Sequence, residues 1–368
     1  MALPKLTERS TAAPGSKSPA QRAPGRGLLR FAAKRLGAAL VQWLIAVTGV
    51  FVLLRLLPAN PAVQFMGNAD AATPAAIAAE ERILGIDTPL IAQVVTFLEH
   101  LVRADFGVSW SSRTPVFAEI ADALPVTIQL IVLAFVVALM VSIPIGIAAA
   151  TRPGSRLDTV VRTYSLFAGS QPEFFWGLLF IFFGWFVLRI FPAPLGQISI
   201  SATAPDPITH FILIDTLLRG DLDTFVNAAS HYLLPVLTMA FALSGPFVKQ
   251  VRENALSVSN SEFMLYARAL GLPRRTLWAY VLRNSLAPVL TLVGLFFAAA
   301  LGGSAIIESV FSLPGVGVYT LQRTLGVDFP AVQGAVALMT GFSLFVYVAM
   351  DIVYAVIDPR IRYGQGSS

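Results

Sequence analysis

Residues 260–288 read NSEFMLYARALGLPRRTLWAYVLRNSLAP, a polar and basic stretch that lies between two long apolar runs. Within it, apolar side chains recur at i, i+3, i+4 and i+7, which is the spacing of one helix face. These side chains are Phe263, Tyr266, Ala267 and Leu270. Gly271 stands where a glycine commonly ends a helix, and Pro273 lies just beyond it. The stretch predicts a short amphipathic helix between two membrane spans, which either lies flat on the lipid surface or inserts its apolar stripe into a cytoplasmic partner.

The composition of the chain excludes a water-soluble globule. Of its 368 residues, 56% are hydrophobic and only 13% are charged, whereas a soluble domain carries about 25% charged residues. The net charge of +5 does not indicate a nucleic-acid partner, because the basic residues lie in the connections where membrane topology places them. The chain has no cysteine, which excludes disulfides and thiolate metal sites. We therefore expect an all-α polytopic protein in a lipid bilayer.

Six apolar segments are long enough to cross about 30 Å of hydrocarbon as helices. They are Leu36–Leu57, Leu124–Ala149, Tyr164–Leu188, Tyr232–Val248, Ser285–Ile307 and Ala331–Val356. Lysine and arginine concentrate before the first span, after the second, after the fourth and in the tail after the last, whereas the alternate connections hold most of the acids. Because cytoplasmic loops are enriched in Lys and Arg, both ends of the chain are expected in the cytoplasm.

The pattern divides the chain into successive segments. They are a disordered basic cytoplasmic tail at 1–27, a first span with a long extracytoplasmic loop at 28–123, a core transmembrane domain at 124–358 with a cytoplasmic loop at 249–284, and a cytoplasmic tail at 359–368. The segment 1–27 is rich in Pro, Gly, Ser and basic residues and has no apolar core, which argues against a signal peptide. Helical spacing from Ile83 to Asp105 predicts helix in the long loop, whereas the apolar piece Ile208–Leu218 is too short to span.

Charged residues inside or at the edge of spans are candidates for function, because ions in lipid are costly. Arg55 and Asp351 lie near the ends of spans, where anchoring at the interface accounts for them. Glu173 lies deeper, directly after Gln171-Pro172, where the proline should break the third helix. It either lines a cavity or pathway or caps the broken helix.

The sequence contains no catalytic signature. There is no Gly-x-x-x-x-Gly-Lys-Ser/Thr motif, so the chain does not hydrolyse ATP by that route. His100, His210 and His231 are not spaced as metal ligands. The run Ala242-Leu243-Ser244-Gly245 lacks the first glycine of a serine-nucleophile motif, and no histidine lies deep in a span. The sequence therefore predicts neither a catalytic residue nor a metal site.

The run from Glu262 to Leu272 resembles the EAA loop of bacterial ABC-importer permeases of the oligopeptide/dipeptide/nickel family. Of the triad that names the loop only the final alanine is kept, as Ala267, and the loop's glycine is Gly271. The family's later Leu-Pro is present as Leu286-Ala287-Pro288, after the longer gap typical of the peptide subfamily. Further family motifs follow in order along almost the whole chain, at Arg55–Pro58, Leu84–Asp87, Asp105–Gly107, Leu234–Pro235, Glu308–Phe311, Asp328–Pro330 and Asp358–Arg360. The long first outer loop and the six spans favour the B-type subunit.

The resemblance implies a type I ABC-importer permease fold and a permease for di- or oligopeptides, with nickel or another small solute as the alternative cargo. It implies a second, C-type permease, two ATPase subunits that use ATP and Mg, and an extracytoplasmic substrate-binding protein as partners in a bacterial inner membrane. It implies no cofactor on this chain itself.

The same resemblance places an ATPase-coupling helix in the central stretch. Its residues are Glu262, Phe263, Tyr266, Ala267, Arg268, Leu270, Gly271 and Leu272. The apolar stripe of Phe263, Tyr266, Ala267 and Leu270 would enter a groove on an ATPase. The rival class is a stand-alone secondary transporter, which would need buried ion-pair or proton-relay residues and inverted repeats. The spans hold few charges and show no repeated halves.

Overall fold

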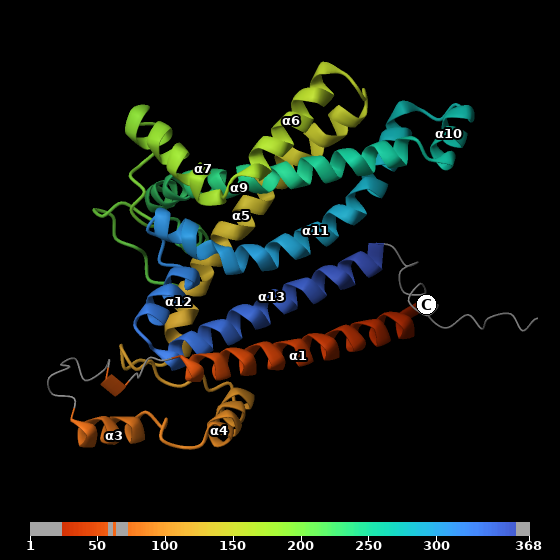
Figure 1. Ribbon diagram of the computed structural model, residues 1–368. Helices are drawn as coiled ribbons and strands as arrows, with labels where there is room; N and C mark the ends of the chain where they lie inside the picture. The colour runs from red at the N-terminus through yellow and green to blue at the C-terminus, as the bar shows by residue number, and fades with distance from the viewer. Residues whose placement is uncertain (1–23, 58–61, 64–72, 358–368) are drawn as a thin grey trace, which may run out of the picture.

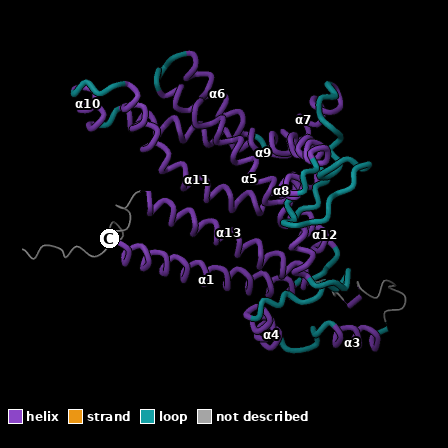
Figure 2. The backbone as a smooth tube through the Cα atoms, turned by 180° about the vertical axis from the view of Figure 1, so that it is seen from behind, coloured by secondary structure: helices purple, strands orange, loops and turns teal. Residues whose placement is uncertain are grey.

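The computed structural model describes residues 24–57, 62–63 and 73–357, and every named element within them is a helix (Figures 1 and 2). The helices are α1 (Pro24–Leu56), α3 (Pro74–Ile83), α4 (Leu90–Val102), α5 (Val116–Ala150), α6 (Arg156–Ser170), α7 (Glu173–Phe180), the π-helix η2 (Ile181–Val187), α8 (Ile212–Leu218), α9 (Leu222–Ser259), α10 (Glu262–Ala269), α11 (Arg274–Val310), α12 (Val316–Leu325) and α13 (Phe329–Ile357). The expected tails at 1–27 and 359–368 lie almost wholly outside the described residues, as do the family motif positions 58 and 358–360.

Five helices are long and apolar enough to cross a membrane: Phe31–Leu56 of α1, all of α5, α9 and α11, and Phe329–Val353 of α13. The third predicted span, Tyr164–Leu188, is instead two helical arms, α6 and α7–η2, which are bent by 99°. The break falls at Gln171-Pro172, where Gln171 has extended backbone angles (φ −112°, ψ 151°). Proline disfavours helical angles in the residue before it, which explains the position of the predicted break. Counted as one broken span, the pair completes the expected six.

The fourth span is much longer than the sequence indicated. The predicted Tyr232–Val248 is the apolar middle of α9, which runs from Leu222 to Ser259. Asp221 caps the start of this helix by accepting a hydrogen bond from Thr224 N at 3.0 Å. A hydropathy pattern detects only the continuously apolar length, whereas the two ends of α9 are amphipathic and continue the helix beyond it.

The centre of the bundle is the crossing of α5 and α9, with α11 packed against both. The apolar core there includes Leu130, Ile131, Tyr232, Met239, Phe247 and Leu301. Glycines make the close approach possible, because a Cβ at Gly146 would lie 2.8 Å from Val251 Cβ. Helix α13 packs against α11 and also lies beside α1 (Figure 1), and Trp43 Nε1 donates to the Ala337 carbonyl at 2.7 Å between α1 and α13.

The connection between α1 and α5 contains the predicted helix, seen as α4, and a second helix, α3, that the sequence reading did not anticipate. The predicted short apolar piece forms α8. These elements and α12 lie at one end of the bundle, whereas α10 lies at the opposite end, together with the start of α1 and the end of α13 (Figures 1 and 2). The helix singled out by the sequence therefore lies at the same end as the first and last described helical residues.

Candidate functional site

The α10 helix begins and ends close to where the sequence indicates. Ser261 is the N-cap, although its hydroxyl donates to the Val258 carbonyl at 2.6 Å rather than capping α10. Gly271 has φ +70°, the left-handed conformation that glycine adopts without strain. Two backbone bonds close the helix in a Schellman motif: Leu272 N donates to Ala267 O at 3.2 Å, and Gly271 N donates to Arg268 O at 2.9 Å. The predicted helix end at Gly271 is confirmed.

The helix has one face buried by its own chain and another that is exposed. Met264 and Ala267 are 1% and 5% exposed, whereas Tyr266 is 68% exposed. Phe263 and Leu270 are exposed with Tyr266. The prediction that Ala267 shares this outer stripe is therefore wrong: its small side chain lets α10 approach the bundle, not a partner. The outer stripe is Phe263, Tyr266 and Leu270, and we call it the α10 outer face.

The buried face of α10 reaches the ends of three spans. Met264 packs in a cluster with Ala150 of α5, Ala255 of α9 and Val281 of α11. A displacement of α10 would move this packed methionine against all three helices, because close-packed interiors transmit strain. The sequence reading missed Met264, since its apolar character alone does not distinguish it from the exposed neighbours.

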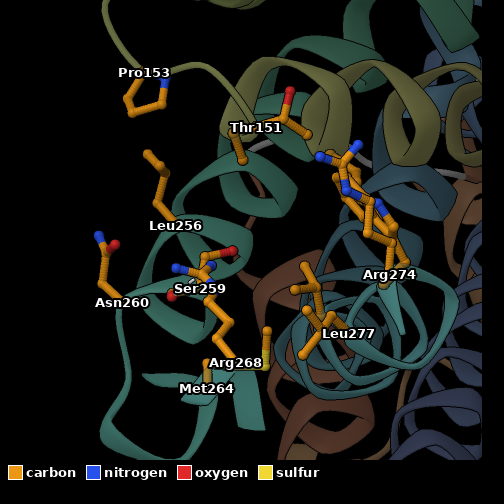
Figure 3. Close-up of a pocket in the computed structure, with 13 residues that line it drawn as sticks. Thr151, Pro153, Leu256, Ser259, Asn260, Met264, Arg268, Arg274 and Leu277 are labelled. Atoms are coloured by element: carbon orange, nitrogen blue, oxygen red, sulfur yellow. Dashed lines mark hydrogen bonds between the residues drawn. The ribbon is translucent and has the colours of Figure 1, made fainter. Parts of the chain in front are cut away.

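A cavity of about 380 Å³ opens beside α10 (Figure 3). Its walls come from four segments: Met264 and Arg268 of α10, Ser259 at the end of α9, Arg274 of α11, and Thr151 after α5. Arg268 Nη2 donates to the Ser259 carbonyl at 3.2 Å. The lining contains two arginines and no carboxylate, so it presents positive charge and apolar surface together.

A partly buried ion pair ties the turn beside this cavity to α9. Asp158, at the start of α6, is 1% exposed and accepts from Arg252 Nη2 of α9 at 2.9 Å. The same carboxylate accepts from Gly154 N at 2.9 Å, and Ser155 Oγ accepts from Asp158 N. The turn between α5 and α6 is therefore tied to α9. These two residues are 94 positions apart in the sequence, so no local pattern predicts that they pair.

Glu173 is the first residue of α7 and lies far from α10 along the bundle (Figure 1). Its position favours a carboxylate, because the amide dipoles of a helix leave positive charge at the N-terminus. Within the described residues its side chain makes no hydrogen bond or ion pair, so the capping interpretation has no contact to support it. A role in a pathway stays a prediction.

Glu308 forms a junction at the end opposite α10. The predicted fifth span ends one residue before it, at Ile307, but Glu308 lies inside α11 and is fully buried. Its carboxylate accepts from Thr127 Oγ1 at 2.6 Å and from Val318 N at 2.8 Å, so it joins α5, α11 and the start of α12. A Cβ at Gly315 would lie 2.4 Å from the Glu308 carboxyl carbon, which explains the glycine there.

Each of the three histidines has a local polar partner. His100 lies 2.8 Å from Asp105, His210 lies 2.9 Å from Asp122, and His231 Nδ1 lies 2.8 Å from the Asn227 carbonyl. Within the part of the chain that the structure describes, no group of three or more potential metal ligands is found.

Known proteins similar to this chain are membrane components of transport systems. Residues 142–363 match the family described as binding-protein-dependent transport system inner membrane component, and residues 28–131 match the N-terminal part of such a component. The dipeptide transport system permease protein DppB of Escherichia coli K12 is 31% identical over 339 residues, which covers 91% of this chain and 99% of that protein.

Two further relatives carry related names. The di/tripeptide transport system permease protein DppB of Pseudomonas aeruginosa UCBPP-PA14 is 32% identical and covers 91% of this chain and 99% of its own length. The probable D,D-dipeptide transport system permease protein DdpB of Escherichia coli K12 is 34% identical, covering 88% of this chain and 95% of its own length.

Proposed function

This chain belongs to the family of binding-protein-dependent transport system inner membrane components, and from that premise we propose that α10 is the segment through which ATPase subunits move it. The chain is a permease subunit of a peptide ABC importer and has no ATPase site of its own. In the proposal a second, homologous permease completes the path, two ATPase subunits hold ATP and Mg, and an extracytoplasmic binding protein delivers cargo.

The proposed orientation places α10 in the cytoplasm of a bacterial cell whose inner membrane holds the chain. Basic residues crowd around α10, including Arg268, Arg274, Arg275 and Arg283. Positive charge marks the cytoplasmic side of a membrane protein. The first span begins and the last span ends at the α10 end of the bundle (Figure 1), which is the arrangement that an even number of spans produces. Both chain ends are then cytoplasmic.

The two faces of α10 are the observation that carries the proposal. A helix-in-groove contact needs apolar anchors at i, i+3 and i+7, which the α10 outer face supplies as Phe263, Tyr266 and Leu270. The buried face is packed on α5, α9 and α11 through Met264. A partner that grips the outer face therefore pulls on three spans. ATP binding and hydrolysis in that partner would shift the bundle between two states by differential affinity.

The proposed cargo is a short peptide of two or three residues. The relatives named above are described as permeases of dipeptide, di/tripeptide and D,D-dipeptide systems. Uptake of a radiolabelled dipeptide by cells that carry the complete system, with and without this chain, tests the cargo. Loss of nickel uptake with unchanged dipeptide uptake would refute it.

Copurification tests the contact of α10 with the ATPases. A Phe263→Asp substitution places a carboxylate in the proposed groove, where it would have to be desolvated. The affinity of the ATPase subunits for the affinity-tagged chain should fall about 30-fold or more, since a well-buried aromatic anchor contributes at least about 2 kcal/mol.

Leu321→Asp is the matched control, because Leu321 is a similarly exposed apolar residue on α12, at the other end of the bundle. Its ATPase retention should equal that of the unmodified chain. If Phe263→Asp also retains the ATPases fully, α10 lies against lipid and the proposed contact is wrong.

A further inference from the structure

A second cavity, of about 600 Å³, lies at the end of the bundle opposite α10. It is open to one side and is lined by α1, the segment 83–88 at the end of α3, α4, the segment 105–113 and the start of α13. Helices α1 and α4 pack against each other there. Among its lining residues are Phe51, Arg55, Gln93, Trp110, Arg113 and Gln333. The function proposed above assigns no role to this cavity.

Two residues that line the cavity each have a buried side-chain nitrogen with no hydrogen-bond acceptor. Arg55 uses its Nε to donate to Gln93 Oε1 at 2.6 Å, but its Nη1 is buried and makes no hydrogen bond. Gln333 is 6% exposed, and its Nε2 is likewise buried and unbonded. Buried polar atoms in proteins nearly always have a hydrogen-bond partner, because an unpaired one loses its hydrogen bonds to water on burial and gains none in their place. Because both residues line the cavity, an acceptor bound in it is within reach of these donors once their side chains turn toward it.

The cavity also presents a fixed positive charge. The Arg55 guanidinium carbon lies 5.0 Å from the centre of the Phe51 ring, 5.1 Å from that of Phe329 and 5.9 Å from that of Trp110. These three rings hold the guanidinium in place by cation–π contact and keep water away from its faces. Arginine stays protonated in proteins, so the charge persists at any physiological pH.

The lining contains two arginines, Arg55 and Arg113, and one carboxylate, Asp105, so its net charge stays positive. Asp105 is engaged by His100 at 2.8 Å and by Gly107 N at 2.9 Å. Hydrogen bonds from these groups hold the pKa of Asp105 below its usual value. Arg113 adds a second cation to the lining. The wall therefore favours an anion with several acceptor oxygens.

We propose that this cavity binds an oxyanion, with Arg55 Nη1 and Gln333 Nε2 as donors. A guanidinium and an amide suit a phosphate or a carboxylate, whose oxygens accept several hydrogen bonds at once. Arg55 is the penultimate residue of the apolar helix Phe31–Leu56, which is the depth of lipid headgroups. The oxyanion is thus either the phosphate of a phospholipid or the carboxylate of a small solute from outside the membrane.

Thermal unfolding of the purified full-length chain in dodecyl maltoside measures this binding. Sodium phosphate, sodium acetate and glycylglycine are each compared with sodium chloride at constant ionic strength, and phosphatidylglycerol is compared with phosphatidylcholine in mixed micelles. A ligand of the folded state raises the unfolding temperature in a saturable way. A rise with phosphatidylglycerol alone assigns the site to a lipid, and a rise with a soluble anion assigns it to a solute. No saturable rise with any probe overturns the proposal.

Gln333→Leu decides whether the binding occurs at this cavity. Because the substitution removes an unpaired donor, the variant should unfold at least as late as the unmodified chain without ligand. Its affinity for the effective anion should fall about tenfold or more, as expected for a lost hydrogen bond to a charged group. Arg55→Lys, which keeps the charge but lacks Nη1, should weaken binding in the same direction.

Gln129→Leu is the matched control, since Gln129 also has a buried, unbonded amide nitrogen but does not line this cavity. It should leave the anion affinity unchanged. Equal affinity in Gln333→Leu and the unmodified chain, or equal losses in Gln333→Leu and Gln129→Leu, would overturn the proposal. The readout requires neither ATP nor transport, so its failure would leave the proposed role of α10 untouched.

Discussion

Replacing Gly271 by valine isolates the contribution of one backbone conformation to coupling. Gly271 has φ +70°, and a Cβ built on it would meet no heavy atom within 4 Å. The substitution therefore introduces no clash, and its cost comes from the left-handed conformation alone, about 1–2 kcal/mol for a residue other than glycine. A β-branched residue is a genuine outlier there, so valine should be at the upper end.

That energy acts on the turn that follows α10. The two bonds that close the helix, from Gly271 N and Leu272 N, both require the left-handed residue. A cost of about 1–2 kcal/mol lowers the population of the closed turn roughly 5- to 30-fold relative to its alternatives. The link between α10 and α11 would then absorb the movement of a bound ATPase instead of transmitting it.

The assay compares cargo uptake with ATP hydrolysis by the complete transport complex in proteoliposomes. Gly271→Val should lower uptake per ATP hydrolysed about tenfold or more, while the amount of chain inserted in the membrane stays the same. Gly271→Asn should retain most of the uptake, because asparagine tolerates the left-handed region.

Gly220→Val is the control for general destabilisation. Gly220 has the same φ of +70°, open space around its Cβ and the same closing pattern after α8, at the end of the bundle opposite α10. It should keep the normal ratio of uptake to hydrolysis. Normal coupling in Gly271→Val, or an equal loss in Gly220→Val, would refute the reasoning.

Two further predictions concern the carboxylates of Asp158 and Asp328. Asp158→Asn removes the counter-ion of the partly buried Arg252 guanidinium and should lower the free energy of unfolding by about 2 kcal/mol, measured by chemical denaturation in detergent. An unchanged midpoint would contradict the ion pair. Burial, which would raise the pKa of Asp328, is outweighed by hydrogen bonds from Ser109 and Ser111, so the pKa lies below its usual value. The ionised Asp328 carboxylate therefore contributes stability that is fully present above about pH 4 and is lost as the pH falls through the lowered pKa. The Asp328→Asn variant should not show this loss of stability when unfolding is followed as the pH is lowered. Identical acid-unfolding profiles for the variant and the unmodified chain would disprove the role of Asp328.

Much of the architecture is readable from local sequence because its causes are local. Apolar runs of sufficient length specify spans whatever surrounds them, since no other structure satisfies the backbone in lipid. Pro172 breaks the third span through its own ring, and Gly271 ends α10 through its own φ. The length of α9 was underestimated because its amphipathic ends carry no hydropathy signal.

The faces and pairings of the site depend on which distant residues come to lie beside each other. Both faces of α10 contain apolar residues, so the sequence pattern could not show that Met264 and Ala267 are buried while Tyr266 is exposed. Asp158 meets Arg252, and Gln333 shares a cavity with Arg55, only after the helices have packed. A helix break at a proline and a helix end at a glycine are decided by the backbone geometry of that residue itself. Burial and charge pairing are properties of the assembled bundle, because the energy of a polar or apolar group depends on the neighbours that replace water around it.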